Sequence, residues 1–317
     1  MTSRIEGVET VSVASIAAAP SATVTREPRS LWGDVWVQFR KHKLAMFGVA
    51  TLAILILGSS VGPLIYTREA EFIDIVVANL QPTPEYPFGT DNLGRDTLAR
   101  VMAGGRISMA VGISAMLIAI LVGTVMGGLA GYYPALDGPL MRLTDMFLAL
   151  PLLPLLLVII LLFRDTLRAA FGPEVGIFIL IVSVIGILNW MPTARVVRAQ
   201  VLTVKEQEFV QAAIAVGTGQ LRILLRHVFP NVLSPIMVAA TLGVANAILT
   251  ESALSFLGLG FPSDFPTWGR LLFDGKDFLQ FTPFLVFWPG LFISLTVLSV
   301  NFLGDGLRDA LDPRLRV

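Results

Sequence analysis

The sequence predicts an all-α integral membrane protein with six transmembrane helices. The chain of 317 residues is 55% hydrophobic and 15% charged, and its mean hydropathy is +0.76. Soluble domains carry about a quarter charged residues, so this composition indicates a membrane protein. Six stretches contain no Asp, Glu, Lys, Arg or His. Each is long enough to supply the roughly 17 to 25 residues that a transmembrane helix needs.

The six predicted spans follow one another along the chain. In order they are Leu44–Thr67, Ile107–Leu136, Met146–Phe163, Val175–Ala194, Val228–Thr250 and Phe278–Gly304. The fifth is expected to continue beyond Glu251 toward Gly260. A backbone in lipid must satisfy its own hydrogen bonds, and these stretches are too long and too evenly apolar for barrel strands. We therefore expect helices.

The distribution of Lys and Arg predicts which side of the membrane each connection faces. With the N-terminus inside, the inner segments hold 15 of the 23 Lys and Arg residues. The basic run Arg40-Lys41-His42-Lys43 lies directly before the first span. Because cytoplasmic loops carry an excess of Lys and Arg, the N- and C-termini are both expected to be cytoplasmic.

This topology divides the chain into five parts. Residues 1–30 are expected to be a flexible cytoplasmic tail, and residues 31–67 an N-terminal segment with the first span. Residues 68–105 are expected to form an extracytoplasmic loop, and residues 306–317 a cytoplasmic C-terminal tail. Between them, residues 106–305 form a domain of five spans that includes a polar cytoplasmic loop at 195–230.

The composition excludes several classes of function. Equal numbers of basic and acidic residues give no indication of nucleic-acid binding, and the chain has no Cys for disulfides or thiolate metal sites. His42 and His227 are its two histidines. Neither a catalytic cluster nor a metal or cofactor site is therefore expected in this chain, and the protein is not expected to be an enzyme.

The 195–230 loop has the pattern of two short helices separated by a glycine. Thr203-Val204-Lys205-Glu206 fits a capping box. Phe209, Ala212, Ala213 and Val216 then form an apolar stripe at helical spacing, and Gly217 is placed to end that helix. The first half of the loop is therefore expected to be one short amphipathic helix.

The second half repeats the pattern. Leu221, Leu224, Leu225 and Val228 form another apolar stripe, and Arg222 and Arg226 share a different face. Pro230 is expected to end this helix and Asn231 to cap the fifth span. Helices this short are not stable alone in water. The pattern itself leaves two interpretations: a connector lying on the membrane surface, or a docking site for another protein.

A resemblance favours docking. The segment Gln211–Gly217, with nine residues before His227-Val228-Phe229-Pro230, resembles the EAA motif of ABC importer permeases in its spacing. Gln211 replaces the acidic residue of that motif, His227 an apolar residue and Phe229 a leucine.

Other segments resemble the C-type subunit of dipeptide and oligopeptide permeases. They are Pro87–Asp96, Glu251–Gly260, Pro266–Gly269 and Gly304–Arg314. The resemblance covers roughly residues 31–316 and implies the type I ABC importer permease fold, with residues 106–305 as its transmembrane domain.

The resemblance implies that separate ATP-binding subunits, which hold ATP and Mg²⁺, drive this chain through the 195–230 loop. The sequence agrees, because it has no phosphate-binding Gly-rich motif of its own. The residues implied in coupling are Glu206, Phe209, Gln211, Ala212, Ala213, Gly217, Arg222, Arg226 and Pro230. Ala212 and Ala213 would let the helix approach its partner closely, whereas Gln211 lacks the expected charge.

The resemblance also implies the setting. It places the chain in the cell inner membrane, with a second homologous permease subunit, two ATP-binding subunits and an extracytoplasmic substrate-binding protein. Peptide is the substrate it favours, with nickel, glutathione, or an opine or sugar as alternatives. A stand-alone secondary transporter is the alternative of another class.

Polar residues at membrane depth are candidates for the translocation path by default. They are Asn189, Asn246 and Glu251, the last two expected on one helix face. For Asn246 and Glu251, a hydrogen bond that holds the bundle is the alternative. In the outer loops, Asp91, Arg95 and Asp96 are interpreted as a local ion pair of Asp91 with Arg95, or as contacts to a binding protein. Trp268 is interpreted as an anchor at the membrane interface.

Overall fold

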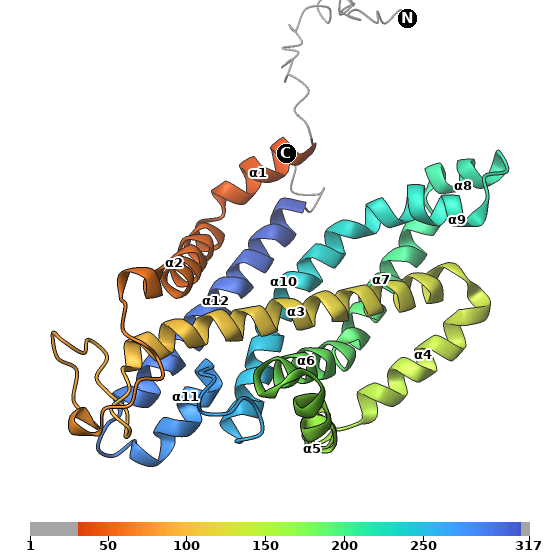
Figure 1. Cartoon of the computed structure of the whole chain (residues 1–317). Coiled ribbons are helices and arrows are strands. Elements are labelled where there is room, and N and C mark those ends of the chain that lie inside the picture. The colour runs from red at the N-terminus through yellow and green to blue at the C-terminus, as the bar shows by residue number, and fades with distance from the viewer. Residues whose placement is uncertain (1–30, 312–317) are drawn as a thin grey trace, which may run out of the picture.

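The computed structural model describes residues 31–311 (Figure 1). The predicted tail at 1–30 and the last part of the predicted C-terminal tail, 312–317, lie outside the described residues. The helices are α1 (Leu31–Lys41), α2 (Lys43–Ile65), α3 (Thr97–Tyr132), α4 (Pro134–Ala149), α5 (Leu152–Phe171), α6 (Pro173–Ile187), α7 (Trp190–Lys205), α8 (Glu208–Ala215), α9 (Gln220–Ile223), α10 (Phe229–Phe256), α11 (Trp268–Gly275) and α12 (Phe284–Leu311). Within 31–311 the β-structure is limited to an isolated bridge between Thr90 and Asp96.

The predicted all-α membrane fold is confirmed. In the described part of the chain, five helical segments are long and apolar enough to cross a membrane: α2, α3, Pro173–Lys205, Gln220–Phe256 and α12. The pair α4 and α5 reaches the same criterion together and would make a sixth span, but it is bent by 86°.

The third predicted span, Met146–Phe163, is therefore not a straight helix. Leu150 adopts an extended conformation with ψ 138°, and Pro151 lies at the start of α5. A proline disfavours the helical conformation in the residue before it and donates no backbone hydrogen bond. The charge-free stretch hid this break because periodicity and hydropathy do not register a single proline.

Several helices extend beyond the charge-free stretches. The side chain of Asp96 accepts a hydrogen bond from the Ala99 backbone N–H, so α3 begins at Thr97 and the predicted 68–105 loop ends earlier. Likewise α7 continues to Lys205, into the predicted 195–230 loop, and α12 continues to Leu311, into the predicted 306–317 tail. Charged residues end a hydrophobic window without ending a helix.

Helix α3 is the centre of the bundle and packs against α2, α6, α7 and α10. Its contact with α7 depends on Gly123, Gly127 and Gly131, each about one turn from the next. A Cβ atom at Gly123 would lie 2.7 Å from the Trp190 carbonyl oxygen, and one at Gly131 would lie 2.9 Å from that of Arg198. Small residues at this spacing let two membrane helices approach backbone to backbone.

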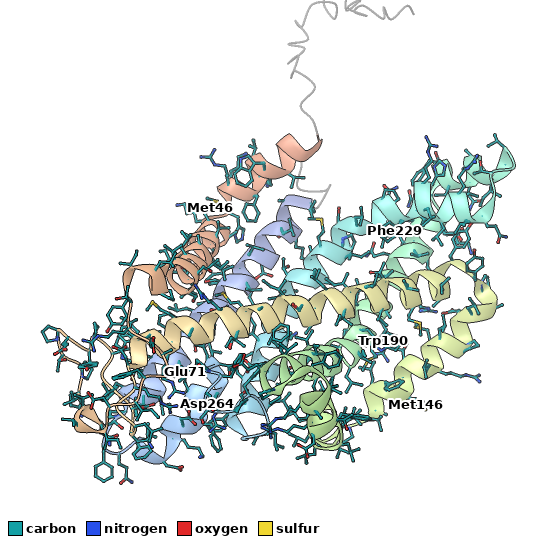
Figure 2. The ribbon with its side chains drawn as sticks, viewed as in Figure 1. Met46, Glu71, Met146, Trp190, Phe229 and Asp264 are labelled. Atoms are coloured by element: carbon teal, nitrogen blue, oxygen red, sulfur yellow. The ribbon has the colours of Figure 1, made fainter. Side chains whose placement is uncertain are left out.

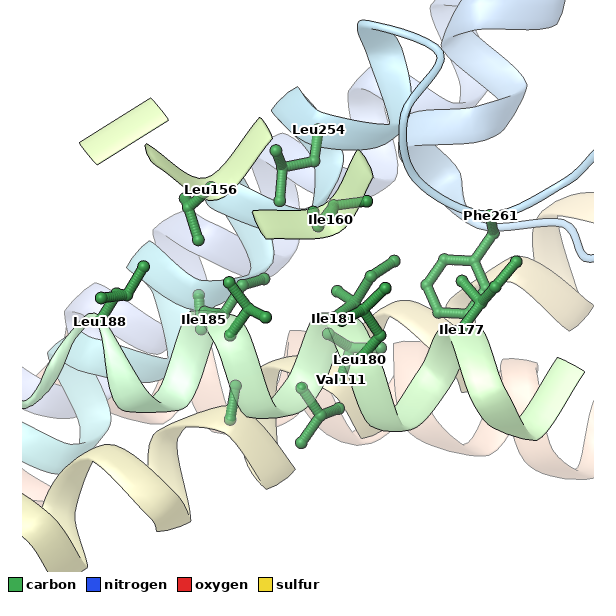
Figure 3. Packing of buried hydrophobic residues seen from close by; sticks show 14 residues of the cluster. Val111, Leu156, Ile160, Ile177, Leu180, Ile181, Ile185, Leu188, Leu254 and Phe261 are labelled. Atoms are coloured by element: carbon green, nitrogen blue, oxygen red, sulfur yellow. The ribbon is translucent and has the colours of Figure 1, made fainter. Parts of the chain in front are cut away.

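The largest hydrophobic cluster lies where α5 and α6 pack on α3 and α10 (Figure 3). Its labelled members are Val111, Leu156, Ile160, Ile177, Leu180, Ile181, Ile185, Leu188, Leu254 and Phe261. Ile181, Ile185 and Leu254 have no exposed surface. This cluster fixes α6 against α3, and so fixes the start of α7 that follows it.

The two ends of the bundle carry different structures (Figure 1). One end, which we call the cap, consists of residues 66–96 and 257–283 and includes α11. The opposite end, which we call the α8 tip, consists of residues 206–228 with α8 and α9. Glu71 and Asp264 lie in the cap, whereas Phe229 lies where α10 approaches the α8 tip (Figure 2).

Candidate functional site

Helix α8 ends at a glycine, as the sequence predicted. Gly217 has a φ of 78°. Its N–H donates to the Ile214 carbonyl at 2.9 Å, and the Thr218 N–H donates to the Ala213 carbonyl at 3.1 Å. This left-handed conformation suits glycine because it has no Cβ atom. The chain therefore reverses sharply between α8 and α9.

The start of α8 differs from the prediction, and the capping box is wrong. Thr203 lies within α7, where its hydroxyl donates to the Ala199 carbonyl at 3.0 Å. Glu206 is the residue at the C-terminal end of α7, and α8 begins after Gln207. Helix α7 continues past Thr203 because Val201 and Val204 are buried in a cluster with α8.

The faces of α8 also differ from the predicted stripe. Val210 and Ala213 are its buried residues. By contrast Ala212 is exposed, and Phe209 and Val216 are 45% and 80% exposed. Of the four stripe positions, Ala213 alone faces inward, because α8 packs on α7 through the Val210 side.

Gln211 has a local partner that the sequence did not reveal. Its side-chain amide donates a hydrogen bond to the Lys205 carbonyl oxygen at 3.0 Å. That carbonyl lies at the end of α7, where helices leave acceptors unpaired. A glutamate at this position would have no proton to donate. The replacement of the acidic residue therefore ties α8 to α7.

The second half of the α8 tip is not a separate helix. Residues 224–228 form one π-helical turn, and the Phe229 N–H donates to the Leu224 carbonyl. Pro230 thus lies inside a continuous helix rather than ending one, and Asn231 donates to the His227 carbonyl instead of capping. A π turn realigns the carbonyl groups that a proline ring would otherwise meet.

The outer surface of the α8 tip is apolar although the helices beneath it are packed. Ile223 and Val228 are buried, whereas Leu221 and Leu225 are 63% and 58% exposed. Arg222 and Arg226 are also exposed and line a hollow with these leucines. The exposed apolar set includes Phe209, Ala212, Ile214, Val216, Leu221 and Leu225. An exposed apolar patch with basic residues beside it is typical of a protein contact surface.

A groove of about 980 Å³ runs between α7 and α10. Asn189, at the junction of α6 and α7, lines it, and so does Asn246 on α10. Residues of α1 and α12, including Arg308, lie along the same groove. The structure therefore brings two of the three predicted path residues to one groove.

Glu251 does not line that groove and does not share a face with Asn246. The two residues are five positions apart, about 140° around the helix. Glu251 has no exposed surface. Its carboxyl oxygens accept hydrogen bonds from Ser108 at 3.1 Å and Ser255 at 2.7 Å. Glu251 therefore holds α3 and α10 together, as the alternative interpretation has it.

The cap contains a buried network of charges. The predicted ion pair of Asp91 with Arg95 is confirmed, with a nitrogen to oxygen distance of 2.7 Å. The guanidinium of Arg100 contacts Asp91 at 2.5 Å and Asp274 at 3.3 Å. Arg270 pairs with Asp274 at 2.8 Å. Arg100 and Asp274 were not predicted, because a separation of 174 residues leaves no pattern in the sequence.

Asp96 is a structural residue of the cap. Besides capping α3, its carboxylate accepts a hydrogen bond from the Tyr66 hydroxyl at 2.5 Å. Burial and this hydrogen bond raise the pKa of Tyr66 above its ordinary value, so its hydroxyl keeps the proton that it donates. Asp91, Arg95 and Asp96 are at most 6% exposed. Their side chains therefore serve the internal structure of the cap, and a direct contact with a binding protein stays an untested prediction.

Trp268 is not an interfacial anchor. It has no exposed surface. Its indole N–H donates to the Val101 carbonyl at 3.0 Å, and its backbone N–H donates to the Ser108 hydroxyl at 3.2 Å. Residues 261–267 lead the chain back so that α11 packs against α3, α10 and α12. Because α11 folds back onto these helices, Trp268 lies in the interior and not at the membrane surface, where the sequence had predicted it.

Comparison with known proteins decides the family. Residues 98–317 match the model of the binding-protein-dependent transport system inner membrane component. Residues 30–82 match the N-terminal TM domain of oligopeptide transport permease C. The chain belongs to this family of inner-membrane transport components.

The chain aligns with its relatives over nearly the whole length of both sequences. The chain is 36% identical to the oligopeptide transport system permease protein OppC of Bacillus subtilis, over 94% of this chain and 95% of the relative. It is 39% identical to the OppC of Haemophilus influenzae, over 92% and 91%. It is 40% identical to the dipeptide transport system permease protein DppC of Bacillus subtilis, over 93% and 89%.

Membership of this family establishes what kind of protein the described structure belongs to. This component is a multi-pass membrane protein with the fold of a type I ABC permease. Its relatives are transport permeases rather than enzymes. The groove between α7 and α10 and the α8 tip therefore belong to the membrane component of a transport system.

Proposed function

We propose that this chain is one permease subunit of an ATP-driven importer that takes up peptides delivered by an extracytoplasmic binding protein. The observation that carries the proposal is its 36% to 40% identity with permeases named for oligopeptide and dipeptide transport. The expected partners are a second homologous permease subunit and two ATP-binding subunits, which hold ATP and Mg²⁺. The chain performs no chemistry itself, and both its termini face the cytoplasm.

The α8 tip is the proposed contact with an ATP-binding subunit. Phe209, Val216, Leu221 and Leu225 expose apolar surface that nothing in the described chain covers. Ala212 is exposed and small, so a partner can approach the α8 backbone there. Glu206, Arg222 and Arg226 supply exposed charges around this surface.

Three of the implied coupling residues act on shape rather than contact. Ala213 packs inward, Gly217 sets the reversal between the helices, and Pro230 lies in the continuous helix below the π turn. Ala213 belongs to a buried hydrophobic cluster, which we call the joint, that also includes Val201 of α7, Val210 of α8 and Val232 of α10. Because this joint links α8 to α7 and α10, a displacement of α8 moves both walls of the groove.

A single substitution pair tests the docking surface. Ala212→Arg places a long charged side chain on the exposed face of α8, and we expect it to abolish co-purification of the ATP-binding subunits. The control is Val76→Arg, since Val76 is 93% exposed in the cap at the other end. Retained assembly with Ala212→Arg, or equal loss with both variants, contradicts the proposed contact.

The same complex separates the alternative functions. Peptide uptake in membranes that contain this chain without ATP-binding subunits would establish a stand-alone secondary transporter instead. Uptake of nickel, glutathione, or an opine or sugar, but not of peptides, by the assembled complex would change the substrate. Our expectation is peptide uptake that requires ATP hydrolysis.

A further inference from the structure

The groove between α7 and α10 is lined by apolar side chains and by uncharged polar ones. Amide and hydroxyl side chains recur along it: Asn189, Thr193, Gln200, Asn231, Ser234 and Asn246. Among the described residues that line the groove, Arg308 is the single charged one. The polar residues lie on segments that are otherwise apolar enough to span a membrane. Polar side chains on membrane-spanning segments often mark a path or a protein contact, because lipid cannot pair them.

Most of these polar groups have no partner within the part of the chain that the structure describes. Asn189 and Asn231 each donate one hydrogen bond to a helix carbonyl, at 2.7 Å, which leaves their amide oxygens free. The side chains of Thr193, Gln200, Ser234 and Asn246 make no hydrogen bond there. Unpaired polar groups in a non-aqueous setting are costly unless water or a ligand pairs them.

The arrangement of the groups matches an extended chain. Asn231, Ser234, Val238, Leu242 and Asn246 follow one another at three- or four-residue spacing and so share one face of α10. From Asn231 to Asn246 this face is about 22 Å long at about 1.5 Å per residue. An extended peptide rises about 3.3 Å per residue, so this length corresponds to about seven residues.

We propose that this groove binds the main chain of the transported peptide and does not distinguish the charges of its side chains. Side-chain amides donate and accept hydrogen bonds, as peptide groups do, so they can pair with a main chain in more than one register. Arg308 is exposed and lies on α12, and the walls formed by α7 and α10 carry no charged lining residue. Along these two walls the groove therefore neither attracts nor repels a Lys or Glu side chain strongly. This inference rests on the proposed function and adds the chemistry of recognition.

The chain offers a direct test of access, because it contains no Cys. In the assembled importer, Ser234→Cys and Asn246→Cys each create a single thiol in this chain. We expect a membrane-impermeant maleimide, applied to detergent-solubilised complex, to label both, and the tripeptide Ala-Ala-Ala with its binding protein and ATP to slow the labelling. Leu117→Cys is the control: it is 63% exposed on α3 and lies outside the groove lining, so peptide should leave its labelling unchanged.

Failure to label either groove position would show that the second permease subunit or lipid covers the groove, and would overturn the proposal. Labelling that peptide does not slow would also overturn it. Neither result touches the proposed function if the unsubstituted complex takes up Ala-Ala-Ala. If that complex takes up no peptide at all, the proposed function fails first.

Charge selectivity provides the second measurement. Uptake of Ala-Lys-Ala and Ala-Glu-Ala is measured for each variant relative to the unsubstituted complex, so that the preference of the binding protein cancels. We expect Asn246→Leu to lower both by a similar factor. Asn246→Asp should lower Ala-Glu-Ala at least about fivefold more than Ala-Lys-Ala, because a fixed charge in a poorly hydrated groove repels a like charge. Equal ratios for Asn246→Asp would contradict the proposal.

Discussion

The cap and the α8 tip differ in what holds each together. In the cap, Asp91 and Asp274 are joined by Arg100, which reaches them from α3, and Trp268 is completely buried. In the α8 tip, Val210 and Ala213 pack inward, but Val216 and Leu221 stay largely exposed. The charged motif Asp91–Asp96 of the cap thus finds its partners within the chain, whereas the exposed apolar groups of the tip do not. The cap motif serves internal structure, and the apolar surface of the tip is the proposed contact with a partner.

The largest effect should come from breaking the charge network of the cap. Arg100→Ala leaves the carboxylates of Asp91 and Asp274 buried with less compensation, which costs about 3 to 5 kcal/mol. We expect a strongly lowered midpoint of thermal unfolding in detergent, or loss of the folded protein. The matched control is Arg226→Ala in the α8 tip, because Arg226 is exposed. Similar midpoints for the two variants would remove the contrast between the ends.

A smaller effect is expected from Glu251. Glu251→Ala leaves the hydroxyl groups of Ser108 and Ser255 without their acceptor, at a cost of about 1 to 3 kcal/mol. Glu251→Gln keeps an acceptor oxygen and should be milder. Thermal unfolding measures both. Because Glu251 lies outside the groove, Glu251→Gln complexes that assemble should take up peptide normally. Loss of uptake with full stability would return Glu251 to the translocation path.

Removing an exposed aromatic side chain from the α8 tip should leave the fold intact and weaken binding of the ATP-binding subunit. Phe209 is 45% exposed, so Phe209→Ala should change the free energy of unfolding by no more than about 0.5 kcal/mol. Aromatic side chains in a protein contact often contribute about 2 kcal/mol or more, so the affinity for the ATP-binding subunit should fall about thirtyfold. Titration of ATP-binding subunit onto the permease measures this. Unchanged affinity would show that Phe209 lies outside the contact.

The smallest effect concerns Gln211. Gln211→Glu removes the hydrogen bond donated to the Lys205 carbonyl and places a negative charge at the C-terminal end of α7. The two changes should loosen α8 by about 1 kcal/mol. Hydrogen exchange at the backbone of α8 should become faster, while the unfolding midpoint stays within error. Slower exchange would mean that the amide is not what ties α8 to α7.

The sequence predicts well what depends on composition and short-range spacing. Charge-free stretches indicated the membrane spans, and the spacing around Gly217 indicated a helix followed by a reversal. Both follow from properties that a residue has in any fold: transfer energy into lipid, and a left-handed conformation without a Cβ atom. The ion pair of Asp91 with Arg95 was also accessible, since its partners are four residues apart.

The remaining features depend on contacts between distant segments. Trp268 became an interior residue because residues 261–267 turn back toward α3. Glu251 was a candidate for the translocation path, but it accepts a hydrogen bond from Ser108 on another helix and so joins two helices. Pro230 did not end a helix because one π turn accommodates its ring. Each outcome depends on what lies opposite a residue in space, and a single sequence carries no record of that.

The glycines of α3 determine how closely α3 and α7 are locked together. With Gly123 and Gly131 against α7, no layer of side chains separates the two backbones, so they cannot slide past each other without a clash. Helices α3 and α7 are then expected to move as one rigid unit, which extends from the cap side to the α8 tip. A displacement of α8 would reach this pair at one end, and the break between α6 and α7 at Leu188 and Asn189 lies at the start of α7. That break also places Asn189 in the lining of the groove.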